Sequence, residues 1–223
     1  MAFGSRRFTP THTPTRGLQT RGTGRPPPQF VTVQLYGDST MRGSPEVGPF
    51  RIAALLQADF DARYGPGQTT IVNNALGGTK IFDLMAGING LPAWPGSRYA
   101  QIAVCCYGIN EASQSNSLQQ FSDALRNFAK YPGTLLQTCL QMDVAVPNNG
   151  TADTTAYAAA IRSVATEMKA PLIETNAYQL GFADWRTRLR DGIHPTDAFY
   201  ADLVRDVMAP AIATRVALLR ATN

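Results

Sequence analysis

Only two histidines and three cysteines occur among the 223 residues of the chain. The cysteines, Cys105, Cys106 and Cys139, lack the paired spacing of a zinc site, and an odd number of them does not suggest a disulfide framework. All three lie in apolar stretches, so we predict buried, reduced thiols. No run of about 18 apolar residues is present, so we expect no membrane-spanning helix.

Acidic residues are absent from residues 1–29, a segment dominated by Thr, Pro, Gly and Arg. This arm holds five arginines: Arg6, Arg7, Arg16, Arg21 and Arg25. The net charge of the chain is +4, and removing those five charges leaves −1 on the rest. The basic character therefore belongs to the arm, and the body gives no support for a nucleic-acid partner.

Aliphatic side chains are almost missing from the same arm, which cannot bury enough apolar surface to fold alone. Pro26, Pro27 and Pro28 favour an extended conformation before the first strand. The arm is therefore either a disordered tail or an anchor that orders against a protein partner in a larger assembly. Arg6-Arg7 is not followed by an apolar segment, so we predict no export signal and synthesis in the cytoplasm.

Strand-like and helix-like segments alternate through the body, residues 30–223. The strand-like segments are 30–36, 69–73, 101–107, 134–140 and 171–174. The helix-like segments are 50–64, 79–88, 118–130, 154–169 and 196–219, the last with a kink expected at Pro210. Such alternation predicts an α/β fold, a three-layer α/β/α sandwich around a mainly parallel five-stranded sheet, with the site at the carboxyl ends of the strands.

A serine follows the first predicted strand directly, in Gly37-Asp38-Ser39-Thr40. That position presents the hydroxyl at the edge of the sheet. The motif alone is weak, because ordinary turns also use Gly, Asp and Ser. A nucleophilic serine additionally needs a base within hydrogen-bonding reach.

His194 is the one histidine of the body, since His12 lies in the arm. It occurs in Asp191-Gly192-Ile193-His194-Pro195, where an acid three residues upstream can reach the imidazole across a turn. The alternative, a capping or surface histidine before the last helix, is weakened by the presence of Ser39. We therefore predict Ser39, His194 and Asp191 as the catalytic residues.

Two further strand ends offer donors for an oxyanion. Residues 73–79 follow the second strand, and Gly78 there offers a backbone N–H. Residues 107–111 follow the third, and Asn110 there offers a side-chain amide. Each segment alone is also a plausible ordinary loop.

The order Ser, Gly, Asn and Asp-x-x-His resembles the SGNH (GDSL-like) hydrolase family over residues 31 to about 200. The resemblance implies a flavodoxin-like sheet, no metal or organic cofactor, and an oxyanion hole formed by Ser39, Gly78 and Asn110. Two motifs depart from the family pattern. Thr40 gives GDST instead of GDSL, and Glu111 stands where the family usually has aspartate. At Glu111 we expect altered loop hydrogen bonding without loss of activity.

The substrate site is less specified by the sequence. Loops 42–49, 87–98 and 144–151 are predicted to rim it. Trp94 and Trp185 are candidate stacking platforms for a sugar ring, with ordinary packing as the alternative. Four arginines are candidate contacts for an acidic polymer, with a solvated basic face as the alternative. They are Arg42, Arg186, Arg188 and Arg190.

We predict a serine esterase that removes short acyl groups, O-acetyl in particular, from a polysaccharide. GDST also occurs in carbohydrate acetylesterases of this family, and no long apolar lid typical of a long-chain lipase is visible. With the arm as an anchor, a bacteriophage virion is the expected setting. Two alternatives stay open: a structural virion or tail subunit with little activity, and an acyltransferase of the same fold.

Overall fold

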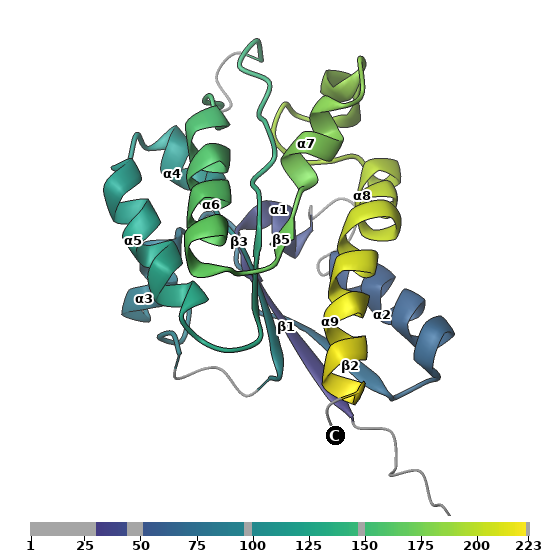
Figure 1. Ribbon diagram of the computed structural model, residues 1–223. Helices are drawn as coiled ribbons and strands as arrows, with labels where there is room; N and C mark the ends of the chain where they lie inside the picture. Colours follow the sequence, from purple (N-terminus) through teal and green to yellow (C-terminus); the bar gives the residue numbers. More distant parts are fainter. Residues whose placement is uncertain (1–29, 44–50, 96–99, 147–149, 222–223) are drawn as a thin grey trace, which may run out of the picture.

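A parallel five-stranded sheet forms the centre of the protein (Figure 1). The computed structural model describes residues 30–43, 51–95, 100–146 and 150–221, so the predicted arm lies outside the described residues. The strands are β1 (Val31–Gly37), β2 (Thr69–Asn73), β3 (Ile102–Cys106), β4 (Thr134–Gln137) and β5 (Leu172–Ile173). Their order across the sheet is β2-β1-β3-β4-β5, so β1 lies between two neighbours and delivers its carboxyl end near the middle of the edge.

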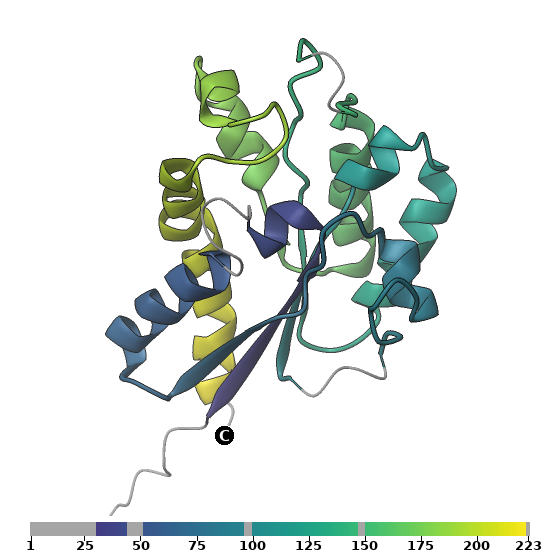
Figure 2. The ribbon, with the colours of Figure 1, turned by 180° about the vertical axis from the view of Figure 1, so that it is seen from behind.

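Helices cover both faces of the sheet, as Figures 1 and 2 show. One face carries α3 (Ile81–Ala86), α5 (Leu118–Ala129) and α6 (Thr155–Met168). The other carries α2 (Arg51–Tyr64), α8 (Asp197–Leu203) and α9 (Ala209–Ala221). The short elements α1 (Ser39–Arg42), α4 (Ile109–Ser113), α7 (Thr175–Leu180) and the 3₁₀ turn η1 (Trp185–Arg188) follow strand ends or loops. The predicted three-layer α/β/α sandwich is confirmed.

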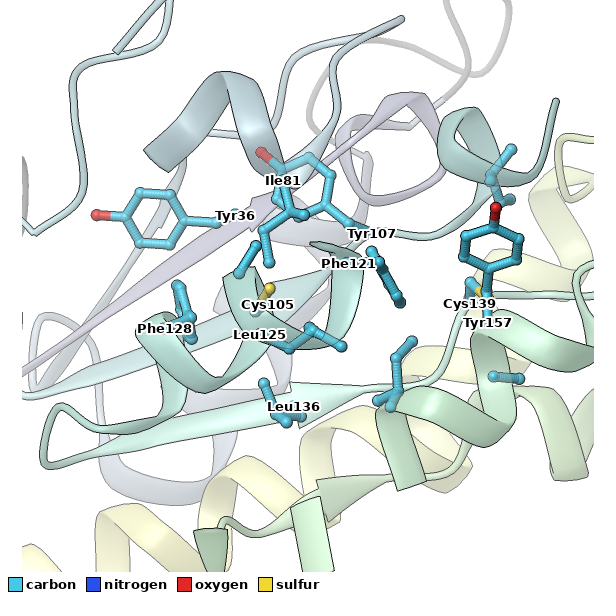
Figure 3. Close-up of a cluster of buried hydrophobic side chains, with 14 of the residues drawn as sticks. Tyr36, Ile81, Cys105, Tyr107, Phe121, Leu125, Phe128, Leu136, Cys139 and Tyr157 are labelled. Atoms are coloured by element: carbon cyan, nitrogen blue, oxygen red, sulfur yellow. The ribbon is translucent and has the colours of Figure 1, made fainter. Parts of the chain in front are cut away.

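Helix α5 illustrates why these segments fold as they do. Ser117 caps its first turn by accepting a hydrogen bond from the Gln120 N–H. Its buried side chains recur at helical spacing: Phe121, Ala124, Leu125 and Phe128. They pack on the sheet against Tyr36, Cys105 and Leu136 (Figure 3), which leaves the polar face of the helix to solvent.

The cysteines are free and buried, as predicted. Cys105 and Cys106 are neighbours in β3 and therefore face opposite sides of the sheet, one in each hydrophobic core. Cys139 lies beyond the end of β4, because that strand stops at Gln137 and not at the predicted residue 140. Burial raises the pKa of all three thiols, which keeps them protonated and unreactive.

Of the two interpretations of Trp94, a stacking platform for a sugar ring or ordinary packing, the structure supports ordinary packing. Its side chain is buried, with 6% exposed, and its ring lies 4.1 Å from that of Phe128 in a nearly parallel stack. Tyr36 and Tyr131 contact the indole edge-on. Trp94 therefore belongs to the hydrophobic core between the sheet and α5, where a substrate does not reach.

Element boundaries differ from the predictions mainly at strand ends and in short helices. The elements α4 and α7 were not predicted, because five or six residues give too little periodicity to detect. The predicted terminal helix is interrupted by a π-helical turn, η2 (Val204–Met208), directly before α9. Pro210 has no N–H to donate to the preceding turn, and a local π turn accommodates that loss.

Gly37 should be intolerant of any side chain. An added Cβ would lie 2.5 Å from the carbonyl oxygen of Cys106 and 2.6 Å from the Cβ of Met41. Because backbone cannot move aside cheaply, we expect Gly37→Ala to lower the free energy of unfolding by about 3 kcal/mol in urea titrations.

Gly67→Ala is the matched control for that substitution. Gly67 has φ +73°, and an added Cβ there would meet no atom within 4 Å. Only backbone strain of about 1 kcal/mol is expected. Equal losses at the two glycines would show that the tight contact beneath α1 is not a constraint.

Candidate active site

Ser39 is the first residue of α1, immediately after the carboxyl end of β1. Asp38 caps that helix: its Oδ1 accepts hydrogen bonds from the Thr40 N–H at 2.9 Å and from the Thr40 hydroxyl at 2.7 Å. Burial raises the pKa of Asp38, and the Thr40 hydrogen bonds oppose this effect. The cap fixes the turn, so Ser39 projects from the sheet edge on a short, rigid element.

The structure brings Ser39, His194 and Asp191 together. The Ser39 Oγ lies 2.8 Å from the His194 Nε2. On the other side of the ring, the His194 Nδ1 lies 2.7 Å from the Asp191 Oδ2. Both distances are those of hydrogen bonds, so the three predicted catalytic side chains form one continuous chain.

Asp191 is ionised at any working pH. Partial burial raises its pKa, but the backbone N–H and ring of His194 and the N–H of Ile193 together bring the pKa down to about 2. Those two N–H groups donate to Oδ1 at 2.8 and 3.0 Å. Since an ionised carboxylate only accepts, the proton between Asp191 and His194 lies on Nδ1. The Nε2 atom is then free to accept the Ser39 hydroxyl proton.

The loop that carries His194 is held from two directions. Gly192 adopts φ +82°, and its carbonyl accepts a hydrogen bond of 2.8 Å from the Asp143 N–H. A Cβ on Gly192 would lie 2.8 Å from the side chain of Val146, so the segment after β4 packs tightly on this turn. The Arg190 N–H donates to the His194 carbonyl at 2.8 Å and closes the loop on itself.

The loops that follow β1, β2 and β3 carry the three predicted donors for an oxyanion. Among the residues that the structure describes, the backbone N–H groups of Ser39 and Gly78 have no hydrogen-bond acceptor. The Asn110 Nδ2 donates one of its two hydrogens to the Thr79 carbonyl at 2.8 Å, which leaves the second hydrogen for another acceptor. The loop of Gly78 runs beside the serine, since a Cβ on Gly77 would lie 3.6 Å from the Ser39 Cβ. Gly78 itself has φ +77°, which favours glycine.

Glu111, the departure from the family motif, is fully buried beside these donors. Its Oε1 accepts the Ile81 N–H at 2.7 Å and its Oε2 accepts the Gly108 N–H at 2.8 Å. Burial raises its pKa to about 7, although both hydrogen bonds act in the opposite direction. The side chain thus connects the second and third loops of the site.

The candidate substrate residues lie in different surroundings. Arg42 lines a cavity of about 260 Å³ together with residues 73–76 and 90–92. Trp185 is half-buried, and the Arg186 guanidinium lies 4.5 Å from its ring centre. The roles of Arg42 and Trp185 in binding substrate stay predictions. Parts of the three predicted rim loops, residues 44–49, 96–98 and 147–149, lie outside the described residues.

The arginines in and just after η1 are paired with acidic side chains. Arg186 pairs with Asp143, Arg188 with Asp184 and Asp202, and Arg190 with Asp191. This pattern favours a solvated, charge-balanced face over a surface for an acidic polymer. Within the described part of the chain, no group of three or more His, Cys, Asp or Glu side chains is placed to hold a metal ion. Nor, in that part, is any helix long and apolar enough to cross a bilayer.

The sequence profile of the GDSL-like lipase/acylhydrolase family matches residues 35–201, a range that includes Ser39, Gly78, Asn110, Asp191 and His194. The chain belongs to this family. No curated protein sequence matches it.

Solved structures share the fold at low sequence identity. A lipase/acylhydrolase from Enterococcus faecalis has a TM-score of 0.66 at 17% identity, covering 83% of this chain and 96% of its own. A variant of an acetyl xylan esterase from Geobacillus stearothermophilus has a TM-score of 0.64 at 17% identity, with 84% and 95% covered. The acetyl xylan esterase AlAXEase gives 0.63 at 20%, with 82% and 98% covered.

Sequence reasoning missed three features of this acylhydrolase site. These are the Asp38 cap, the approach of Gly77 to Ser39, and the two-ended hydrogen bonding of Glu111. Asp followed by Ser-Thr signals a helix cap, and the paired glycines of Gly77-Gly78 signal a close backbone approach. Nothing local signals the reach of Glu111 to Ile81, which lies 30 residues earlier.

Asp191 should contribute stability that depends on pH. Its folded-state pKa of about 2 is below its ordinary 3.8, so its contribution is present above pH 3.8 and is lost as the pH falls toward 2. We expect Asp191→Asn to be less stable than the wild type by on the order of 1 kcal/mol at about pH 6, after allowance for solvent screening of this partly exposed group. Unfolding titrations in urea should show the difference shrinking toward about pH 2. A difference that does not change with pH would contradict the electrostatic interpretation.

Proposed function

We propose that this protein is a serine esterase that removes short acyl groups, acetyl in particular, from carbohydrate. One observation carries the proposal: the hydrogen-bonded series Ser39 Oγ, His194 Nε2, His194 Nδ1 and Asp191 Oδ2, with contacts of 2.8 and 2.7 Å. A serine hydroxyl is a weak nucleophile unless an oriented base accepts its proton. Membership of an acylhydrolase family supports the same chemistry.

Acylation of the enzyme begins at the Ser39 hydroxyl. As its oxygen attacks the ester carbonyl, His194 Nε2 takes the proton and the ring becomes an imidazolium, stabilised by ionised Asp191. The tetrahedral oxyanion accepts hydrogen bonds from the Ser39 and Gly78 N–H groups and from the Asn110 amide. His194 then protonates the departing alcohol oxygen, the carbon–oxygen bond breaks, and the acyl group remains on Ser39.

Deacylation repeats these steps with water as the nucleophile. His194 Nε2 removes a proton from the attacking water, and the same three donors hold the second oxyanion. When that intermediate collapses, the bond to Ser39 Oγ breaks and the hydroxyl regains its proton from His194. The acid product leaves, and no external cofactor is consumed in this sequence.

Two observations support acetylated carbohydrate as the substrate class. Two proteins of similar fold are named acetyl xylan esterases, and their folds cover more than four fifths of this chain. The half-buried Trp185 also remains available as a candidate surface for a sugar ring. The paired arginines argue against strong preference for an acidic polymer.

Acetate release from a panel of acetylated glycans tests the proposal. Ser39→Ala should lower the rate by about 10⁶-fold, because the nucleophile and its base act as a unit. Ser122→Ala is the matched control: that partly exposed serine donates to the Leu118 carbonyl within α5, and the rate should not change. Equal acetate release by Ser39→Ala and the wild type would remove the esterase proposal. Acyl transfer to an added sugar in place of acetate release would identify an acyltransferase.

Asn110→Ala tests the oxyanion hole separately from the nucleophile. We expect kcat for p-nitrophenyl acetate to fall about 10²- to 10³-fold, because the amide donor acts on the charge that develops in the transition state. KM should change little, since the ground-state carbonyl binds that donor weakly. A fall in kcat below about threefold would show that Asn110 does not face the reacting carbonyl.

A further inference from the structure

Glu111 holds two parts of the backbone with one side chain. It lies in the first turn of α4, with 0% of the residue exposed. Its two carboxylate oxygens accept different N–H groups, one from Ile81 at the start of α3 and one from Gly108 before α4. The first turn of a helix leaves its N–H groups without partners inside the helix, so each helix start gains an acceptor from this carboxylate.

A second hydrogen bond runs parallel to that bridge. The Asn110 Nδ2 donates to the Thr79 carbonyl at 2.8 Å. Residues 79–81 and 108–111 are therefore joined at two points, through adjacent side chains. Gly78 precedes the first segment directly and Asn110 belongs to the second. The separation of these two oxyanion donors is therefore set by the bridge.

We propose that Glu111 is a positioning residue for the oxyanion hole, acting in its ionised form to hold the Gly78 N–H and the Asn110 amide at the separation that an oxyanion requires. The inference rests on the proposed esterase function. Glu111 does not touch the reacting atoms, because its carboxylate oxygens are occupied by backbone donors. It acts only through the loops that it joins.

The length and charge of the side chain both matter to this role. Aspartate, the usual residue of the family at this position, is one methylene shorter and would not reach both N–H groups across the same backbone separation. An ionised carboxylate offers only acceptors, whereas a protonated carboxyl or an amide presents a donor on one of its two ends. One of the two N–H groups then loses its partner, and the bridge opens at that end.

The surroundings of Glu111 make its ionisation sensitive to pH near neutrality. Burial raises its pKa to about 7. Among the described residues, the titratable groups that interact with it become negatively charged when they ionise, and none is a cation. They are Asp38 before α1, Cys105 in β3, Tyr107 directly after β3, Cys139 after β4, and Tyr157 in α6. The nearby Lys80 ammonium is bonded to Gln114 instead. Glu111 must therefore lose its proton for full activity.

The pH profile of the wild type is the first test and needs no variant. We expect log kcat/KM for p-nitrophenyl acetate, measured from about pH 5 to about pH 9, to fall on the acid side by about one log unit more than a single ionisation produces, because the enzyme with protonated Glu111 should be about tenfold slower. In Glu111→Gln, which has no proton to gain, that extra fall should be absent. A wild-type profile that fits a single ionisation would overturn the proposal.

The rate at high pH is the second test. Glu111→Gln should lower kcat about tenfold, the effect of one lost hydrogen bond, with KM changed less than about twofold. Glu111→Asp should lower kcat at least as much. Glu167→Gln is the matched control, because that exposed carboxylate pairs with Arg126 far from the loops and its loss should leave kcat unchanged. If the Glu111 variants lack a cooperative unfolding transition, the wild-type pH profile decides.

A double-mutant cycle identifies the route through which Glu111 acts. If it positions Asn110, then Glu111→Gln combined with Asn110→Ala should be no more than about twofold slower than Asn110→Ala alone. Losses that multiply in the double variant would show that the two residues act independently and would overturn the proposal. Activity retained by Ser39→Ala would instead reject the esterase function itself, so the two failures are distinguishable.

Discussion

The contact between the Ser39 hydroxyl and the His194 ring, 2.8 Å long, joins residues 155 positions apart in the chain. It forms only because both loops reach the same edge of the sheet. All five strands are parallel, so every strand ends in the same direction and each following loop lies at that edge. Three other features hold the loops of the site in place: the helix cap at Asp38, the turn at Gly192 and the hydrogen bonds of Glu111.

Three carboxylates near the site show how surroundings assign different tasks to the same chemical group. Asp191 is only partly buried and accepts hydrogen bonds from the Ile193 and His194 N–H groups and the His194 ring, so its pKa is about 2 and it can stabilise an imidazolium. Glu111 is fully buried, and its pKa rises to about 7. Asp38 is also buried, and its Oδ1 caps α1 by accepting two hydrogen bonds from Thr40. Burial and the number of donors, more than residue type, decide which carboxylate carries charge into the reaction.

Much of the fold and the residues of the proposed catalytic triad could be predicted from the sequence, because the relevant signals are local. Buried strands such as Ile102–Cys106 are continuous apolar runs, and Asp191 lies one turn from His194. The failures involve contacts between distant segments. The sequence does not decide whether Trp94 contacts a sugar or packs internally, because an aromatic residue in a loop-like stretch gives no sign of the Phe128 ring that covers it. The hydrogen bond from the Ile81 N–H to Glu111 depends on how the segments after β2 and β3 pack together. No spacing of residues in the chain predicts that packing.

The central claim is that the fold activates one particular hydroxyl. Reaction with a fluorophosphonate probe, followed by peptide mass spectrometry, tests it most directly, because the probe captures only a serine whose proton is removed by a base. The account predicts a phosphonyl adduct on Ser39 in the folded protein, absent after denaturation and strongly slowed in His194→Ala. No adduct on Ser39, or an adduct that forms equally fast without His194, would contradict it.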